Sequence, residues 1–281
     1  MAVRKVSAKG HRAETKKRPL RALQPAVAGD AGGAQLAPVP GAPQRLARGS
    51  GRGTRAQALD VIFASAVELG EGFRHGALGI PRYGKTYHVQ EVVSEALTRG
   101  IVDVALVHDV KKADAQYEGM VRVDPADLHA RPPGEADEAV VVFHPAADSE
   151  RIVSLEEVSQ LGFTFARAGT KTLVVADELY AGLKSRQTWD GPTTARIFRE
   201  GSSQCLSIAW TTQIPQSMPT EVTDLSETVA LFHLEGRSAS YAAETFRLPP
   251  EAVALLSRLE RGEFLLFSTY AGWDGVVYGP G

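Results

Sequence analysis

The eight residues 79–86, which read GIPRYGKT, constrain the fold of this chain more than any other segment. They follow the spacing Gly-x-x-x-x-Gly-Lys-Thr, in which glycines at both ends allow the backbone to curl tightly. An apolar run at residues 73–79 predicts a strand before the loop, and an amphipathic pattern predicts a helix near residues 85–98 after it. The sequence therefore predicts a strand, a tight loop and a helix in direct succession.

The chemistry of this loop predicts that it binds the phosphates of a nucleotide. Backbone N–H groups in such a loop point inward at phosphate oxygens, beside the positive end of the following helix. Lys85 would reach the β and γ phosphates of ATP, and Thr86 would offer its hydroxyl to Mg²⁺. An ordinary glycine-containing turn is the alternative. We favour a Walker A motif with the nucleotide-binding residues Gly79, Ile80, Pro81, Arg82, Tyr83, Gly84, Lys85 and Thr86.

Short apolar runs alternate with amphipathic stretches in the rest of the chain. Strands are expected at residues 73–79, 102–108, 139–144, 172–176, 206–211 and 229–234, and helices near residues 85–98, 155–168 and 193–200. This alternation predicts an α/β fold with a mainly parallel sheet covered by helices on both faces. Ser154 and Glu157 have the spacing of a capping box at the start of the second helix.

Two adjacent acids follow the apolar strand at residues 172–176. Asp177 would hold the Mg²⁺ shell, and Glu178 would polarise the water that attacks the γ phosphate. Adjacent acids after a strand also occur as helix caps, so the pair alone is ambiguous. The Walker A motif favours the catalytic interpretation.

A further strand, at residues 206–211, also ends in polar side chains. Thr212 and Gln213 follow it, and Gln213 is placed to contact the γ phosphate. The helix upstream of this strand carries Arg196 and Arg199, and we expect it to stop at Gly201.

The charge of the chain is unevenly distributed. Residues 1–55 hold 12 of the 31 Lys and Arg residues and two of the 33 Asp and Glu residues, so this segment carries a net charge of +10 and the remainder −12. Few apolar residues occur there at helical or strand spacing, which predicts a disordered basic arm before a single ATPase domain at residues 56–281. Such an arm is typical of contact with nucleic acid, acidic lipid or acidic protein, and equally of a solubilising tail.

Several classes of protein are not expected. No run approaches 18 uninterrupted apolar residues, and charges occur throughout the first 25 residues, so we predict neither a membrane span nor a secretory signal. The single cysteine, Cys205, has no internal disulfide partner and is a poor start for a zinc site. We expect a soluble protein made inside a cell.

The order of these segments resembles the FtsK/HerA superfamily of P-loop ATPases. After the Walker A motif come VHDVKK at residues 107–112, VVADE at 174–178, TTQIPQSMP at 211–219 and LERGEFLLF at 259–267. The sequence is most similar to the DNA-packaging ATPases of tectivirus-like viruses with internal membranes. The resemblance covers about residues 70–270, and the TQxP segment is its most specific element.

The resemblance implies a fold and a set of partners. The fold would be an additional-strand ATPase core, in which the strand before Gln213 lies between the Walker A and Walker B strands. The assembly would be a hexameric or similar ring that hydrolyses ATP and pumps double-stranded DNA, in the host cytoplasm or at a virion vertex. The arm would contact capsid-vertex or internal-membrane proteins. A cellular DNA translocase, or an assembly or extrusion ATPase that moves protein, are the alternatives.

The resemblance leaves the arginine finger open. Many relatives carry an arginine directly after the glycine of the REG segment, where this chain has Ser202. Arg199 or Arg196 would reach the γ phosphate of a neighbouring subunit instead, and we favour Arg199. Both arginines are explained equally well as ordinary solvent-exposed charges on a helix.

Other candidates are weaker. The loop that carries Lys184, Arg186 and Trp189 would either face a central pore or be an ordinary surface loop. The segment from Asp109 to Lys112 would lie near the nucleotide or in solvent. The histidines have no ligand spacing, and His75, His88, His108, His144 and His233 are expected to be structural.

Overall fold

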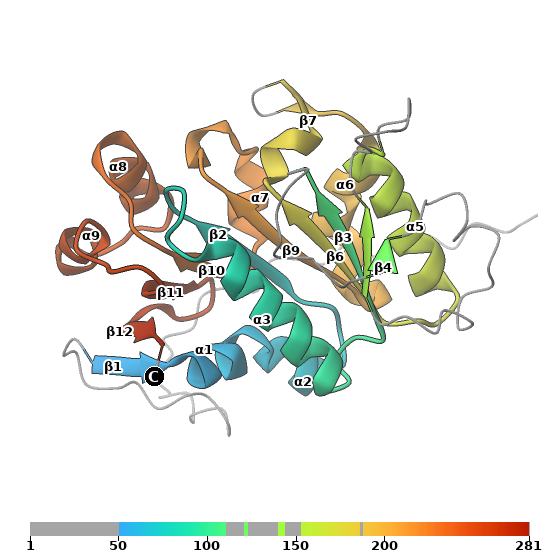
Figure 1. The fold of residues 1–281 in the computed structure, drawn as a ribbon, viewed down its shortest axis with the longest axis horizontal. Coiled ribbons are helices and arrows are strands. Elements are labelled where there is room, and N and C mark those ends of the chain that lie inside the picture. The colour runs from blue at the N-terminus through green and yellow to red at the C-terminus, as the bar shows by residue number, and fades with distance from the viewer. Residues whose placement is uncertain (1–50, 111–120, 123–139, 144–152, 186–187, 281) are drawn as a thin grey trace, which may run out of the picture. The chain divides into compact units, whose positions relative to one another are not determined.

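The computed structural model describes residues 51–110, 121–122, 140–143, 153–185 and 188–280. Their strands form a ten-stranded sheet in the order β1-β12-β11-β10-β2-β9-β6-β3-β5-β4 (Figure 1). The bounds are β1 Gly51–Thr54, β2 Arg74–Leu78, β3 Val104–Asp109, β4 Val121–Arg122, β5 Val140–Phe143, β6 Thr172–Asp177, β9 Leu206–Thr212, β10 Thr228–Leu231, β11 Phe264–Ser268 and β12 Gly272–Gly279. A small antiparallel pair, β7 (Leu183–Ser185) and β8 (Thr188–Trp189), lies outside this sheet.

The sheet is parallel from β10 to β4 and has mixed strand directions at its other end. β11 runs antiparallel to both β10 and β12, whereas β1 is parallel to β12. β9 pairs in parallel with β2 on one side and with β6 on the other. The predicted mainly parallel α/β sheet is therefore confirmed, with the additional strand between the Walker A and Walker B strands.

Helices cover both faces of the sheet. They are α1 Arg55–Ile62, α2 Ala64–Leu69, α3 Lys85–Thr98, α5 Leu155–Arg167, α6 Pro192–Arg196, α7 Thr220–Leu225, α8 Gly236–Thr245 and α9 Pro250–Leu256. Along β6, Val174 packs in the same core cluster as α5, whereas Val175 packs in the same cluster as α3. Because successive strand residues point to opposite faces, these two clusters lie on opposite sides of the sheet. Figure 1 shows α3 crossing one of these faces.

The expected capping box at the start of α5 is present. The Ser154 hydroxyl accepts a hydrogen bond from the backbone N–H of Glu157 at 3.2 Å, and the Glu157 carboxylate accepts one from the backbone N–H of Ser154 at 2.9 Å. This exchange satisfies two N–H groups that the first turn of a helix leaves without partners.

The predicted stop of the α6 helix at Gly201 is wrong. A π-helical segment, Ile197–Gly201, and a 3₁₀ turn, Ser202–Gln204, continue the helix, and the left-handed residue is Cys205 with a φ of 55°. A Cβ atom on Gly201 would lie 2.7 Å from the carbonyl oxygen of Leu206. Close packing, and not a positive φ, therefore accounts for the glycine.

The end of the expected arm also differs. Residues 1–50 lie outside the described residues, but residues 51–54 form β1 in register with residues 276–279 of β12. Thr54 then caps α1 in a capping box with Gln57. Residues 51–55 therefore belong to the fold, since backbone pairing and a cap fix a segment that has little apolar surface.

The described residues contain no helix with both the length and the apolar composition needed to cross a lipid bilayer.

Candidate active site

The Walker A loop connects the end of β2 to the start of α3. Gly79 lies against the residue that follows β10, since a Cβ atom on it would come 2.6 Å from the Cβ of Phe232. Gly84 precedes the first residue of α3 with a φ of 104°, a conformation that glycine adopts without strain. The motif thus needs its two glycines for different reasons: the first because another segment approaches closely, and the second because the backbone is left-handed.

Segments from the C-terminal part of the chain hold this loop in place. The backbone N–H of Ile80 donates to the carbonyl of His233 at 3.1 Å, and the N–H of Gly262 donates to the carbonyl of Tyr83 at 3.0 Å. The Tyr83 ring stacks on the His233 ring with centroids 4.4 Å apart. The loop is therefore held by contacts distant in sequence as well as by its own glycines.

Lys85 and Thr86 begin α3 and are both buried. The Lys85 ammonium donates to the carbonyl of Ile80 at 2.9 Å, so it folds back over the loop that it follows. The Thr86 hydroxyl lies 3.4 Å from Oδ1 of Asp177. The structure thus brings the Walker A hydroxyl and the first Walker B acid together, as the sequence predicts.

Asp177 ends β6 and Glu178 follows it, both buried. The Thr211 hydroxyl donates to Oδ1 of Asp177 at 2.8 Å and accepts from the backbone N–H of Glu178 at 2.9 Å. Glu178 has left-handed backbone angles, φ 60° and ψ 69°. Such a conformation costs a non-glycine residue about 1–3 kcal/mol, and the Thr211 hydroxyl holds it.

Gln213, one residue beyond β9, completes this group. Its side-chain amide donates a hydrogen bond to Oε1 of Glu178. Asp109, at the end of β3, is the register partner of Asp177 and is also buried. The polar groups thus gather at the carboxyl ends of β3, β6 and β9, the usual position of ligands in parallel α/β sheets.

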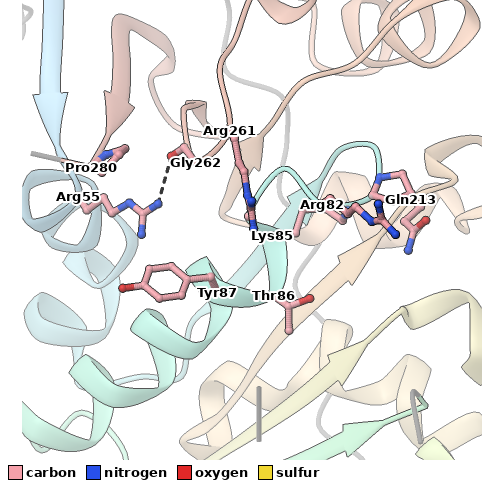
Figure 2. Close-up of a pocket in the computed structure, with 11 residues that line it drawn as sticks. Arg55, Arg82, Lys85, Thr86, Tyr87, Gln213, Arg261, Gly262 and Pro280 are labelled. Atoms are coloured by element: carbon pink, nitrogen blue, oxygen red, sulfur yellow. Dashed lines mark hydrogen bonds between the residues drawn. The ribbon is translucent and has the colours of Figure 1, made fainter. Parts of the chain in front are cut away.

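A cavity of about 520 Å³ lies beside the loop (Figure 2). Its lining residues are Arg55, Pro81, Arg82, Gly84, Lys85, Thr86, Tyr87, Gln213, Arg261, Gly262 and Pro280. Four of these carry a positive charge and none carries a carboxylate. A polyanion of the size of a nucleoside triphosphate is the ligand that such a cavity favours.

The cavity also contains Arg55, Tyr87, Arg261 and Pro280, which the sequence does not mark as site residues. The Arg55 guanidinium pairs with Glu91 at 2.6 Å, donates to the carbonyl of Gly262 at 3.2 Å and lies over the Tyr87 ring at 4.9 Å. Burial raises the pKa of Glu91, and the adjacent Arg55 opposes that shift. Arg261 lies in the segment LERGEFLLF, but nothing in that pattern marks it as a site residue, and Arg55 and Pro280 reach the cavity from the paired β1 and β12 edge.

The predicted arginine fingers do not line this cavity. Arg199 pairs with Glu221 at 2.5 Å, and Arg196 pairs with Glu200 at 2.7 Å. Both belong to the helix whose apolar residues pack on the sheet face opposite α3. A role for Arg199 in a neighbouring subunit stays a prediction.

The weaker candidates are spread over the structure. Lys184 is exposed on β7, and the indole N–H of Trp189 on β8 donates to Glu221. Arg186, Lys111, Lys112 and His144 lie outside the described residues.

Two histidines, His75 on β2 and His88 on α3, are packed against each other. Nε2 of His75 lies 2.9 Å from Nε2 of His88, and Nδ1 of His75 lies 2.8 Å from the Thr228 hydroxyl. Burial lowers the pKa of His75 to about 3 and the pKa of His88 well below its usual value. Both rings are therefore neutral at physiological pH, in agreement with the predicted structural role.

The chemistry of the site suits Mg²⁺ bound together with a nucleotide. No group of three or more His, Cys, Asp or Glu residues in the described part of the chain forms a metal cluster by itself. Magnesium, however, is usually held by one or two protein oxygens together with phosphates and water. The Thr86 hydroxyl and the Asp177 carboxylate supply such oxygens.

Known structures with the same fold include two viral NTPases. The genome packaging NTPase B204 from Sulfolobus turreted icosahedral virus 2, in complex with ATP-gammaS, superposes with a TM-score of 0.59 at 13% identity, over 74% of this chain and 97% of that chain. B204, the DNA-packaging ATPase from Sulfolobus turreted icosahedral virus, gives 0.58 at 15% identity, over 74% and 97%. No protein-family model and no curated protein matches the sequence. The expected resemblance is thus confirmed at the level of the fold, and this chain has the P-loop NTPase fold of the B204 packaging enzymes.

Proposed function

We propose that this chain is an ATP-hydrolysing translocase of double-stranded DNA that acts as a viral genome-packaging motor. The observation that carries the proposal is the meeting of Lys85, Thr86, Asp177, Glu178 and Gln213 at one edge of the sheet, beside a cavity lined by cations. The B204 enzymes, whose fold this chain shares, package DNA and bind nucleotides, which supports the same assignment here.

Each residue has a role in hydrolysis. ATP binds with its phosphates in the loop, and Lys85 transfers its hydrogen bond from the Ile80 carbonyl to phosphate oxygens. Thr86 and Asp177 would hold Mg²⁺, which neutralises charge on the phosphates when bound. Glu178 takes a proton from water as the water oxygen bonds to the γ phosphorus and the bond to ADP breaks. Gln213, which already contacts Glu178, orients that carboxylate and the water.

We infer that the motor is a homo-oligomeric ring, with a hexamer as the expected form. Translocation needs each subunit to pass the DNA to its neighbour, and Arg199 on the exposed surface of one subunit would contact the next. Lys184 on β7 would lie in the pore and contact phosphates. The basic arm at residues 1–50 would bind DNA or a vertex protein.

The test is ATP hydrolysis by the purified protein with and without linear double-stranded DNA. We expect DNA to stimulate hydrolysis, and we expect Glu178→Gln to bind ATP but to turn it over at least about 100-fold more slowly, since it loses the general base. Glu68→Gln, which changes an exposed carboxylate on α2 away from the cavity, is the matched control. Hydrolysis that DNA does not stimulate would instead favour an ATPase that moves protein.

A further inference from the structure

The fourth residue of the Walker A loop, Arg82, has an unusual backbone conformation. Its φ is 67°, in the left-handed region that non-glycine residues rarely occupy. The conformation costs roughly 1–2 kcal/mol relative to a right-handed one. Strain of this kind persists only where the surrounding structure holds it, and it clusters at ligand sites.

The Arg82 side chain lines the cavity and keeps its charge available. Neither Arg82 nor Arg261 has a carboxylate of the described residues within ion-pair distance, whereas Arg55, Arg196 and Arg199 are each paired. Arg82 is also exposed to solvent from its place in the loop. Among the described residues, no carboxylate therefore competes with a bound anion for the Arg82 guanidinium.

The position of Arg82 along the cavity distinguishes it from Arg261. Figure 2 shows the Arg82 side chain extending toward the end of the cavity where Gln213 lies, and Arg261 extending toward Lys85 from the side of Gly262 and Pro280. The Gln213 amide contacts the Glu178 carboxylate, so this end holds the general base. A triphosphate bound in the loop must point its γ phosphate toward that base, and hence toward Arg82.

Phosphoryl transfer spreads negative charge over the three equatorial oxygens of the γ phosphate, and a planar guanidinium pairs with two such oxygens at once. The chain has Ser202 where the resemblance would place an arginine from the neighbouring subunit. We propose that Arg82 supplies this charge in cis, by binding the γ-phosphate oxygens of the ATP held by its own subunit. This inference rests on the proposed ATP hydrolysis at the same site and goes beyond it.

The decisive variant is Arg82→Gly, because glycine adopts the positive φ without strain, so the loss of the side chain is not confounded by a strained backbone. We expect its kcat to fall about 10³-fold, the low end of the range for arginine fingers, while the affinity for ADP changes little. Arg82→Lys keeps the charge without the planar fork and should recover only part of the loss. Arg237→Ala, which removes an exposed charge outside the cavity, is the matched control and should hydrolyse at the wild-type rate.

Two further readouts separate this role from a structural one. Binding of ADP with fluoroaluminate, a transition-state analogue, should weaken in Arg82→Gly far more than binding of ADP alone, as measured with a fluorescent ADP derivative. A mixture of Arg82→Gly and Glu178→Gln chains should stay inactive, because a cis arginine cannot complete a neighbour's site. Recovery of activity in that mixture would show that Arg82 acts in trans and would overturn the proposal.

The outcome also distinguishes this inference from the proposed function. If Glu178→Gln is inactive while Arg82→Gly hydrolyses at the wild-type rate, the arginine role is wrong and the ATPase assignment stands. If DNA fails to stimulate hydrolysis but Arg82→Gly loses kcat, translocation is wrong and the arginine role stands.

Discussion

The replacement of Thr211 by valine tests how the two acids of the site are held. Valine has nearly the same shape, so the change removes a hydroxyl that donates to Asp177 and accepts from the N–H of Glu178, both in the buried core. A hydrogen bond to a charged group contributes about 1.5–3 kcal/mol, and removing the acceptor of a buried N–H costs about 1–3 kcal/mol. Since the two effects share one group and are not additive, we expect the free energy of unfolding to fall by about 2–4 kcal/mol.

The assay is urea unfolding followed by tryptophan fluorescence, because Trp210 lies one residue away on β9 and is fully buried. We expect a lower midpoint with an unchanged slope, and a lower kcat because Glu178 loses the hydrogen bond that fixes its backbone. Thr164→Val on the exposed side of α5 is the control and should change stability by at most about 0.5 kcal/mol. A Thr211→Val protein with wild-type stability and kcat would refute the role assigned to this hydroxyl.

Further outcomes are expected. Lys85→Ala should abolish hydrolysis with the fold intact, because the lysine supplies charge to phosphates and not packing; circular dichroism and an ATPase assay check both parts. Deletion of residues 1–50 should leave basal hydrolysis unchanged and should weaken DNA binding. The slope of the logarithm of the DNA-binding constant against the logarithm of the salt concentration should become shallower by about 0.9 for each phosphate that the arm no longer neutralises. Deletion of residues 1–55 should lower hydrolysis as well, since it removes β1 and Arg55, and equal activity of the two truncations would contradict the described edge of the sheet. Stability should fall as the pH drops below about 6.5, because the unfolded chain binds protons on His75 and His88 that the native state, with its lowered pKa values, does not. The free energy of unfolding should change by at most about 1.4 kcal/mol per pH unit for each histidine. A free energy of unfolding in urea that is constant from pH 7 to pH 5 would argue against a buried neutral pair.

The sequence predicts the parts of this molecule that depend on local pattern. The strand, loop and helix around Lys85 are where the spacing places them, and α3 begins at that residue. Asp177 is recognisable because it follows a fully apolar strand, and parallel strands bring such ends together.

Long-range pairing accounts for the parts of the site that the sequence does not reveal. Arg55 reaches the cavity only because β1 pairs with β12, more than 200 residues away along the chain. The left-handed backbone of Glu178 has no sequence signal, since the residue is not glycine and its conformation depends on Thr211. The predicted helix stop at Gly201 is wrong because a glycine near the end of a helical pattern has two explanations. It can form a left-handed cap, or it can leave room for another segment, here the Leu206 carbonyl.

The bonds that hold the Walker A loop have a consequence for the synthesis of the chain. Ile80 and Tyr83 are bonded to His233 and Gly262, residues that leave the ribosome long after the loop itself. The loop therefore cannot take its final form on a nascent chain that ends before Gly262, and pairings of such high sequence separation form late in folding. If ATP binds in this loop as proposed, it would bind only to chains that extend past Gly262, and it would stabilise those chains against proteolysis more than shorter ones.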